Sequence, residues 1–578
     1  MQASYENIER LEQIHRPDEA LLSRDPDHCP RLVRDPRACR SADPQAVPFL
    51  HGDTVSLPLM RTTTESQQGP GNTATHAVLV GTPARLLCAS VVVLAVALLG
   101  ALGVLAFQHA NDRYQVDEVA GTRMALAMWA DEGGRLYPPL YDGEHYGGSR
   151  SMPIPIVLHA GLAKLTGEYL TSGKVLSAVS FLLLLTIFYL VLRSFRVPLF
   201  LTVALVGTVV ATQIGFEQAA GIKADALPAA LQLAAIFVVS RSKRTVVTVS
   251  AGVLCSLALF AKFSAVWAPL AIVVWGLIRE RRVLWGFIAS YLGACALLLA
   301  IFYRATEGRL VENFVAFSFA GVSGETSILR PGRMLPLLAT FGLIVWGLLP
   351  FAILELAGQV RARDLQLPLL ALVACTIVTA VAFTAVGVNY NHLTDLIVLI
   401  AVGVGAYWAR TSSTSSSLTS TAAALMLLLV MGLVTAGLSA TVGPGPGKGS
   451  GGASGNSGTS TDVISRYVKP GDSVLYEDPG LAVSHGALPI VLDPFMLLRL
   501  DQQHPEWIDD LIDRIRLKDF DRIVLEFPIE APTPRDRYDV NSLGRRVVDA
   551  IDRYYEPISL DENGVLLPTD RYVIYAPR

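Results

Sequence analysis

Two adjacent carboxylates, Asp117 and Glu118, follow shortly after the first strongly apolar segment of the chain. A carboxylate can take a proton from an attacking hydroxyl, and neighbouring carboxylates can also hold a divalent metal ion. Asp117 is therefore the candidate general base, with Glu118 as its helper or as a metal ligand. A structural interpretation is also open, because an acidic pair at the start of a helix interacts favourably with the helix dipole.

A basic side chain, Arg150, stands later in the same segment, directly before the Pro-Ile-Pro stretch at 153–155. A guanidinium can bind a phosphate through paired N–H groups, so Arg150 is a candidate phosphate ligand. His145, a few residues earlier, is interpreted as a surface histidine.

Three ionisable residues stand at the ends of later apolar runs, namely Lys223, Asp225 and Lys262. Such groups at membrane depth are costly and are usually paired or functional. Asp225 and Lys223 are candidates for binding an acceptor, with Asp225 a second possible metal ligand, and Lys262 is a candidate phosphate ligand. Alternatively, Lys223 extends toward headgroups and Lys262 is a short-loop lysine that reaches water.

A polar cluster at the start of another apolar run contains Asn389, Asn391 and His392, together with Tyr390 and Asp395. A wall that faces a sugar needs hydrogen-bonding groups of this kind. The cluster could equally be a helix cap, since Asn favours that position.

Composition indicates what must position these residues. The chain has 578 residues, of which 52% are hydrophobic and 17% are charged, whereas soluble domains carry about 25% charge. With a mean hydropathy of +0.44, this composition predicts several membrane spans. The net charge of −3 gives no indication of a nucleic-acid partner, and the six cysteines show no zinc-site spacing.

Apolar runs divide the chain into about eleven predicted transmembrane helices. The first, Leu86 to Phe107, is about 33 Å long as a helix, enough to cross a bilayer once. The further runs are at 175–193, 197–215, 224–240, 245–261, 264–278, 283–303, 335–355, 366–388, 392–409 and 418–441. Glu355 falls near the end of one run and is interpreted as an interfacial residue.

The distribution of basic residues predicts the orientation of these helices. With the N-terminus in the cytoplasm, the short external connections hold only Lys223 and Lys262, whereas the short internal loops are rich in basic residues, as the positive-inside rule requires. The internal residues are Arg193, Arg196, Arg241, Lys243, Arg244, Arg279, Arg281, Arg282, Arg361, Arg363 and Arg410. An odd number of spans then places the C-terminus outside.

These patterns predict four parts. Residues 1–83 form a disordered cytoplasmic tail, residues 84–441 a transmembrane domain with a structured external loop at 108–171, and residues 442–461 a Gly/Ser-rich linker. Residues 462–578 form a small extracytoplasmic α/β domain, with strands at 473–476, 490–492, 522–526 and 571–575 and helices at 505–517 and 541–554. Its carboxylates Glu477, Asp478 and Asp493 could contact an acceptor.

Several motifs together resemble the GT-C superfamily of integral-membrane glycosyltransferases, in particular its protein mannosyltransferase-like and aminoarabinose-transferase-like branches. The resemblance covers about residues 84 to 500. It is carried by the acidic pair, Gly133-Gly-Arg-Leu-Tyr137-Pro, the Pro-x-Pro helix, Gly221-Ile-Lys-Ala-Asp225, Phe260-Ala-Lys262, Gly387-Val-Asn-Tyr-Asn391-His, Val474-Leu-Tyr-Glu-Asp-Pro and Leu492-Asp-Pro. The aminoarabinose branch has a lysine near the place that Arg150 occupies here.

The resemblance implies a GT-C-like enzyme in the plasma (inner) membrane that takes a sugar from a polyprenyl-phosphate donor. The acceptor would be a hydroxyl of a glycolipid, polysaccharide or protein of the cell envelope. No cofactor is required by the residues themselves, although a divalent metal ion is possible at Glu118 or Asp225. The main alternative is a polytopic transporter or flippase of lipid-linked saccharides, although the chain shows no internal repeat of the kind that many transporters have.

Overall fold

The computed structural model forms two units, residues 1–81 and residues 82–578, and every described residue lies in the second. The described residues are 86, 89–90, 92–93, 96–97, 100, 103–104, 118–132, 136–242, 244–317, 332, 334–341, 343–362, 365–384, 388, 390–411, 460–529, 542–559 and 572–578. The predicted tail, the linker up to residue 459 and the last predicted span at 418–441 therefore lie outside the described residues.

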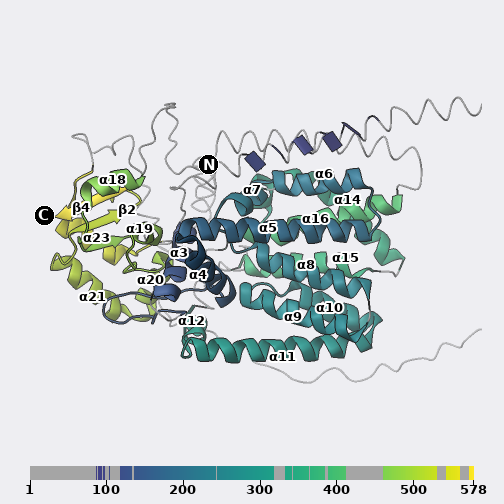
Figure 1. The fold of residues 1–578 in the computed structure, drawn as a ribbon, viewed down its shortest axis with the longest axis horizontal. Helices are drawn as coiled ribbons and strands as arrows, with labels where there is room; N and C mark the ends of the chain where they lie inside the picture. Colours follow the sequence, from purple (N-terminus) through teal and green to yellow (C-terminus); the bar gives the residue numbers. More distant parts are fainter. Residues whose placement is uncertain are drawn as a thin grey trace, which may run out of the picture. The chain divides into compact units, whose positions relative to one another are not determined.

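Within the described segments, three helices are long and apolar enough to cross a membrane by themselves: α5 (Tyr169–Ser194), α11 (Arg281–Ala305) and the stretch Tyr390–Thr411, which joins η3 (Tyr390–Leu393) to α16 (Thr394–Thr411). Shorter apolar helices run beside them (Figure 1). They are α8 (Ala226–Arg241), α9 (Thr245–Ala261), α10 (Trp267–Arg279) and α15 (Leu367–Ala382), accompanied by α13 (Met334–Phe341) and α14 (Leu343–Arg361). The helices follow the predicted apolar runs, while the total of eleven spans remains a prediction.

One predicted span is bent. The run at 197–215 forms α6 (Leu199–Ala211) and α7 (Gln213–Ala220), which meet at an angle of 77°. The Thr212 hydroxyl ends one helix and begins the next, because its Oγ1 accepts a hydrogen bond from the Gly215 amide at 3.0 Å. A side chain at position 215 would place its Cβ 2.2 Å from the Val209 carbonyl oxygen, so the bend requires glycine there.

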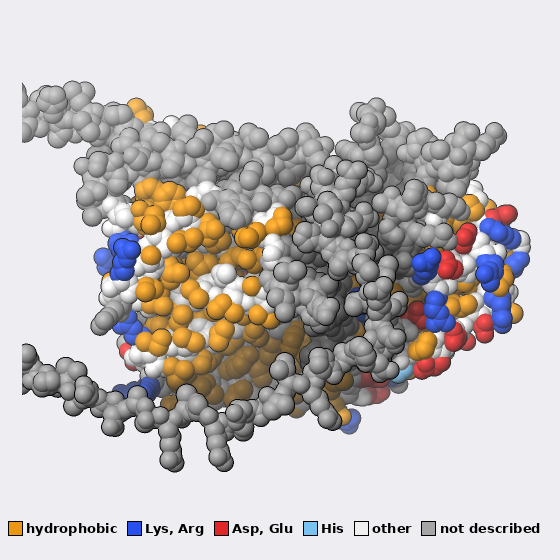
Figure 2. Space-filling model, turned by 180° about the vertical axis from the view of Figure 1, so that it is seen from behind, with side chains coloured by type: hydrophobic (Ala, Val, Ile, Leu, Met, Phe, Trp, Pro, Cys, Tyr) orange, Lys and Arg blue, Asp and Glu red, His pale blue; other side chains and the backbone are white. Residues whose placement is uncertain are grey.

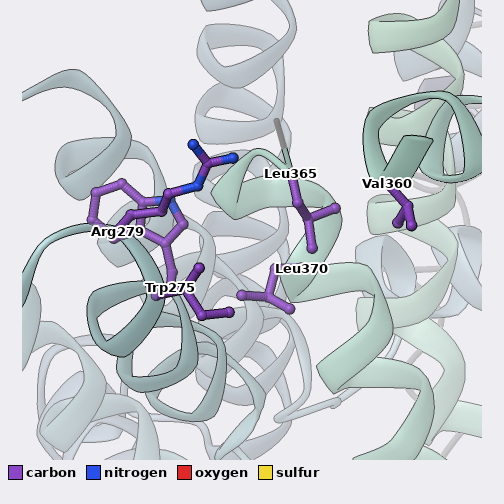
Figure 3. Close-up of a pocket in the computed structure, with 6 residues that line it drawn as sticks. Trp275, Arg279, Val360, Leu365 and Leu370 are labelled. Carbon is purple, nitrogen blue, oxygen red and sulfur yellow. The ribbon is translucent and has the colours of Figure 1, made fainter. Parts of the chain in front are cut away.

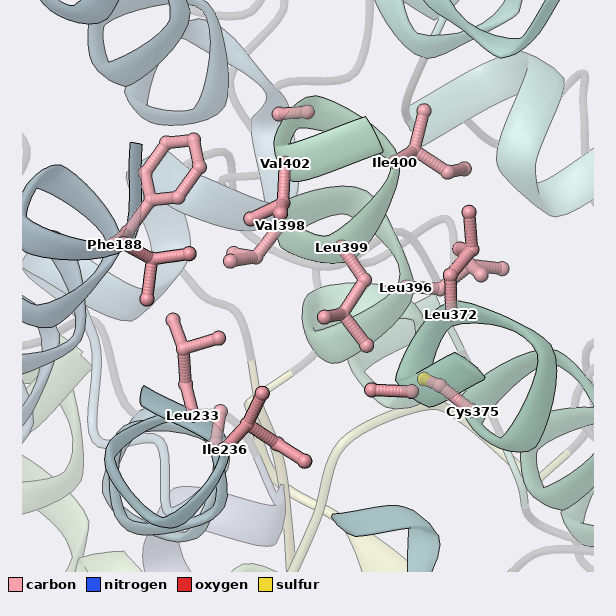
Figure 4. Packing of buried hydrophobic residues seen from close by; sticks show 14 of the residues in the cluster. Phe188, Leu233, Ile236, Leu372, Cys375, Leu396, Val398, Leu399, Ile400 and Val402 are labelled. Carbon is pink, nitrogen blue, oxygen red and sulfur yellow. The ribbon is translucent and has the colours of Figure 1, made fainter. Parts of the chain in front are cut away.

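A single apolar core joins these helices. Phe188, Leu233, Ile236, Leu372 and Leu399 are buried against one another and come from four helices (Figure 4). Close approach depends on small residues. In α16, a Cβ at Gly405 would lie 2.5 Å from a methyl carbon of Leu192, and one at Gly403 would lie 2.9 Å from the Cβ of Ala352.

The outer face of the helical part is apolar, with exposed side chains such as Leu182, Trp285 and Leu297. Figure 2 shows this apolar surface between a basic end and the charged surface of the C-terminal part. Together with the apolar helices, this arrangement indicates a multi-pass membrane protein.

Glu355 differs from its prediction as an interfacial residue. Its side chain is 1% exposed and accepts a hydrogen bond from Arg410 Nε at 2.9 Å and another from Gln359 Nε2 at 2.9 Å. The ion pair joins the ends of α14 and α16, which pack along each other, so Glu355 locks two helices together.

A small sheet domain, comprising the described residues from 460 to 578, follows the helices. Its sheet has the order β1-β2-β4-β3, in which β1 and β2 are parallel and the other pairs antiparallel. Apolar faces of α21 and α23 pack against each other beside a core that includes Leu475, Ile523 and Val573. The elements are α18 (Ser460–Tyr467), β1 (Val474–Tyr476), α19 (Pro479–Ser484), α20 (Pro494–Gln503), α21 (Pro505–Arg516), β2 (Arg522–Leu525), α23 (Arg545–Tyr554), β3 (Tyr555–Pro557) and β4 (Val573–Pro577).

Three predicted strands and both predicted helices coincide with elements of this domain, whereas α18, α19, α20 and β3 were not predicted. The predicted strand at 490–492 does not join the sheet. Instead, Val491 forms an isolated bridge with Tyr146 from the segment before the Pro-x-Pro helix. The Tyr146 amide donates to the Ile490 carbonyl at 2.7 Å, and the Leu492 amide donates to the Tyr146 carbonyl at 3.0 Å. These residues therefore attach the predicted loop 108–171 to the sheet domain.

Within that loop, α3 (Glu118–Glu132) and α4 (Pro153–Thr166) are well-defined helices. They share an apolar cluster with both neighbouring parts, since Met124 and Ile156 contact a group that includes Ile222 and Phe260 from the helical part and Val483 from the sheet domain. The described part of the loop is thus a packed layer, and its external position remains a prediction.

Candidate active site

A buried ion pair lies where α8 begins and α9 ends. Asp225 stands directly before α8 and its side chain is 1% exposed, and Lys262 directly follows α9. Lys262 Nζ lies 2.5 Å from Asp225 Oδ1. Because removing two charges from water is costly, a buried pair is stable only when hydrogen bonds satisfy its remaining polar atoms.

Two amides supply those hydrogen bonds. Asn391 Nδ2 donates to both oxygens of Asp225, at 3.2 and 3.4 Å, and Gln218 Nε2 donates to Oδ2 at 3.3 Å. Asp225 is thus bound by side chains from three other segments of the chain. The structure brings together three residues that the sequence nominated separately: Asp225, Lys262 and Asn391.

A second charged group forms around Glu217 in α7. Lys223 Nζ lies 3.5 Å from Glu217 Oε2, and Tyr390 Oη donates to both carboxylate oxygens, at 2.9 and 2.8 Å. Gln213 Nε2 adds a hydrogen bond at 3.1 Å. Both groups combine residues of 213–225 with residues of η3, and we call them together the charged cluster.

The backbone between the two groups is fixed by a serine. Ser177 Oγ in α5 accepts a hydrogen bond from the Lys223 amide at 2.8 Å and donates one to the Lys223 carbonyl at 2.8 Å. The bend at Thr212 turns α7, which carries Glu217, by 77° from α6. The bend and Ser177 therefore position the Glu217–Lys223 pair.

A third cation reaches the charged cluster from α3. Arg123 Nη1 donates to the Ile222 carbonyl at 2.7 Å, between Gly221 and Lys223. Its charge acts on Asp225 together with that of Lys262. Arg123 could not be predicted from the sequence, because nothing in its spacing relates α3 to the stretch 221–225 about a hundred residues later.

His392 lies among the same charges. It belongs to η3, next to Asn391, and the charged groups that act on it are Lys262, Asp225, Arg150 and Arg123. Arg150 is itself exposed, and its guanidinium lies 5.0 Å from the centre of the Phe495 ring. Arg150 therefore stands between the charged cluster and the sheet domain.

Asp493 is the acidic neighbour of Arg150. Its Oδ1 accepts hydrogen bonds from the amides of Phe495 and Met496 and so begins α20. Burial raises the pKa of Asp493 above its usual value, while the nearby Arg150 lowers it in part. Asp493 thus begins α20 and interacts with an arginine, and its contact with an acceptor remains a prediction.

The other two acidic candidates of the sheet domain also have internal roles. Glu477 accepts hydrogen bonds from the Ser542 hydroxyl and the Glu526 amide, each at 2.7 Å. Asp478 accepts one from Tyr572 Oη at 3.1 Å. Both carboxylates are 2% exposed, which makes a direct contact with an acceptor sugar unfavourable.

The predicted general base, Asp117, is located only by its place in the sequence. Asp117 and Asn389 lie outside the described residues, and for Glu118 only its place as the first residue of α3 is described. Asp117 therefore stands immediately before a helix that carries Arg123 into the charged cluster. His145 is a half-buried residue whose ring meets Trp129 edge-on at 5.4 Å.

The described residues offer limited support for a metal ion. No three His, Cys, Asp or Glu side chains within the described ranges lie close enough to hold one. Asp225, one of the two candidate ligands, binds Lys262 through Oδ1. Glu118 as a metal ligand remains a prediction.

The charged cluster is distinct from a cavity of about 460 Å³ that lies between the ends of α10, α14 and α15 (Figure 3). Trp275, Arg279 and Leu370 line this cavity. Arg279 ends α10, whereas Lys262 precedes its first residue, so the cavity lies about one helix length, roughly 20 Å, from the cluster.

Comparison with solved structures shows that the fold is shared with GT-C membrane glycosyltransferases, which confirms the resemblance expected from the sequence. ArnT from Cupriavidus metallidurans bound to undecaprenyl phosphate matches with a TM-score of 0.54 and 14% identity, over 83% of this chain and 97% of that one. The oligosaccharyltransferase AglB from Archaeoglobus fulgidus, in complex with an inhibitory peptide and a dolichol-phosphate, matches with a TM-score of 0.52 and 10% identity, over 84% of this chain and 74% of that one. No protein-family model and no curated protein sequence matches the chain.

Proposed function

We propose that this protein is a membrane glycosyltransferase that moves a sugar from a polyprenyl-phosphate donor to an acceptor hydroxyl. The observation that carries the proposal is the charged cluster, in which Lys262, Lys223 and Arg123 gather at one end of an apolar bundle. Support comes from the fold, which is also that of ArnT bound to undecaprenyl phosphate.

The chemistry assigns separate tasks to the acidic and basic groups. The acceptor oxygen forms a bond to the anomeric carbon of the sugar, the bond from that carbon to the phosphate oxygen breaks, and the phosphate leaves on its lipid. Asp117 takes the proton of the acceptor hydroxyl, with Glu118 as its helper. The leaving phosphate needs a cation and not an acid, because its oxygen is already a good leaving group.

The cations of the charged cluster suit that second task. Lys262 and Lys223 each form an ion pair with one carboxylate, and their side chains are 19% and 14% exposed. Both lysines lie next to helix ends at the same end of the bundle. A phosphate can replace a carboxylate as the partner of a lysine, so donor binding would redistribute these ion pairs. Arg150 is placed to bind the phosphate from the side of the sheet domain.

The polar residues of η3 suit the sugar. Asn391 and His392 are half-buried, and Gln218 Oε1 is a buried acceptor atom without a hydrogen-bond partner among the described residues. We propose that these groups and Asn389 recognise sugar hydroxyls. The sheet domain and the charged cluster would then lie on the extracytoplasmic face of the plasma (inner) membrane, with residues 1–83 in the cytoplasm.

The proposal predicts a missing sugar in cells that lack the protein. Mass spectrometry of envelope glycolipids, polysaccharides and proteins should show one product shortened by a single sugar, and restoring the gene should restore it. Restoration with Lys262→Gln should fail, whereas restoration with Lys164→Gln, which changes an exposed lysine of α4, should succeed. Unchanged envelope glycans in the deletion strain would contradict the proposal.

A further inference from the structure

The helix α3 is buried on nearly every side. Met124, Ala125, Leu126 and Met128 are at most 2% exposed, and α3 packs against α19 of the sheet domain as well as against α4. A helix held this tightly transmits the position of its neighbours, because packed interiors deform little. Its contacts on opposite faces therefore determine where its ends lie.

On one face, Gly121 meets the start of α19. A Cβ at this position would lie 2.3 Å from Asp478 Oδ1 and 2.7 Å from the Gly480 amide nitrogen, both closer than real Cβ atoms approach. Neither obstacle can easily move. Asp478 Oδ1 accepts a hydrogen bond from the Gly480 amide at 2.9 Å, and Oδ2 accepts one from Tyr572.

On the other face, Arg123 binds the helical part. Residues 121 and 123 are about 200° apart around a helix, so their side-chain directions are nearly opposite. Arg123 donates to the Ile222 carbonyl at 2.7 Å, beside Lys223. The helix α3 is therefore fixed to the sheet domain through Gly121 and to the charged cluster through Arg123.

We infer that Gly121 is a positioning residue through which the sheet domain sets the place of α3 over the charged cluster. Glu118, the first residue of α3, precedes Gly121 by three residues, so a shift of α3 moves the start of the helix by the same amount. The catalytic consequence rests on the proposed function. In this view the sheet domain serves catalysis through α3, and its own carboxylates Glu477 and Asp478 keep its structure.

The test compares Gly121→Ala with Gly161→Ala. Gly161 in α4 has open space where a Cβ would be added, so its variant is a matched control. For Gly121→Ala we expect kcat to fall by about tenfold or more, because displacement of about 1 Å is enough for such a loss, with KM for the donor unchanged. Amide hydrogen exchange should become faster in residues 118–132 and 479–484, and both quantities should stay at the wild-type value in Gly161→Ala.

A second variant guards against loss of folding. Tyr572→Phe removes the hydrogen bond to the Asp478 carboxylate without adding an atom next to α3, and kcat is expected to fall by about threefold because the side chain that Gly121 contacts is then held less firmly. Wild-type kcat and exchange in Gly121→Ala, or an equal loss in Gly161→Ala, would overturn the inference. A wild-type protein that transfers no sugar would remove the proposed function instead, and the exchange comparison would still decide whether Gly121 holds α3.

Discussion

The residues of the charged cluster stabilise one another through ion pairs and hydrogen bonds. Asp225 is buried with a charge, and it is stabilised by a lysine and two amides from other segments. The sequence singled out Lys223, Asp225, Lys262, Asn391 and His392 because ionisable and amide groups near apolar runs are unusual. It did not reveal Glu217, Gln218 or Arg123, because their roles arise only when the bend at Thr212 and the packing of α3 bring distant segments together.

Removing one partner of the Asp225–Lys262 ion pair should cost more stability than replacing both partners. Lys262→Gln leaves Asp225 without its cation and is expected to destabilise the fold by about 3 kcal/mol, whereas the double variant with Asp225→Asn should recover much of that loss. Thermal unfolding in detergent measures this difference. Both variants should lack transfer activity, and a double variant no more stable than the single one would contradict the assignment of a coupled pair.

The predicted base allows a sharper test of activity. Asp117→Asn should abolish transfer without lowering expression or thermal stability, because the amide keeps the size of the side chain but cannot take a proton. Glu132→Gln changes an exposed acid at the other end of α3 and should keep full activity. Normal transfer by Asp117→Asn would remove it as the general base.

At the scale of elements, hydropathy predicted where helices run but not how they break or pair. The run at 197–215 reads as one span, yet Thr212 and Gly215 end one helix and start another. Ile490–Leu492 reads as a strand because of its composition, but its partner is Tyr146 in a distant loop. Pairing between remote segments leaves no local signal in a sequence. The apolar faces of α21 and α23, in contrast, are visible as a helical period in the local sequence.

The bend in α6 and α7 should be needed for function. Gly215→Val places a side chain against the Val209 carbonyl and should lower the free energy of unfolding by about 1–3 kcal/mol. The cost is large because the obstacle is backbone, which cannot move aside as a flexible side chain can. Straightening the bend would also withdraw Glu217 from Lys223, so transfer activity should fall with stability. Gly293→Ala in α11, where a Cβ meets open space, is the control and should leave both unchanged.

The contact between α4 and α5 should depend on pH. Burial lowers the pKa of His159 to about 4, although its Nε2–H donates to the Tyr169 carbonyl at 2.7 Å, which acts in the opposite direction. The unfolded chain binds a proton near pH 6.5 and the folded chain does not, so this histidine's contribution is complete above pH 6.5 and declines as the pH falls toward 4.

Unfolding temperatures at pH 7.5 and pH 5 measure that effect. The wild type should lose stability on acidification, and His159→Gln, which cannot titrate, should lose less over the same interval. An equal loss in both proteins would show that His159 does not contribute to the pH dependence.

For the whole molecule, the structure combines an apolar bundle, a packed layer of α3 and α4, and a sheet domain. Composition and apolar runs were sufficient to predict a polytopic protein with a C-terminal α/β part, and the GT-C fold is confirmed by its likeness to ArnT and AglB. The orientation in the membrane depends on the positions of the basic residues and remains a prediction.

A reporter fused after Arg578 tests that orientation. An alkaline phosphatase fusion should be active, because the account places the C-terminus outside the cytoplasm, and a fluorescent fusion that matures only in the cytoplasm should be dark. Fusions after Arg241, in a predicted internal loop, should give the opposite pair of signals. A cytoplasmic C-terminus would overturn the odd span count and place the charged cluster on the wrong face.

Sugar transfer by the purified protein is the most direct test of the central claim. The full chain in detergent is incubated with polyprenyl-phosphate sugars and an envelope acceptor extract from the deletion strain, and the product is identified by mass spectrometry. The account predicts an acceptor heavier by one sugar and release of the lipid phosphate, with no product from Asp225→Asn. Movement of the donor across vesicles without any transfer would instead identify a transporter and contradict the account.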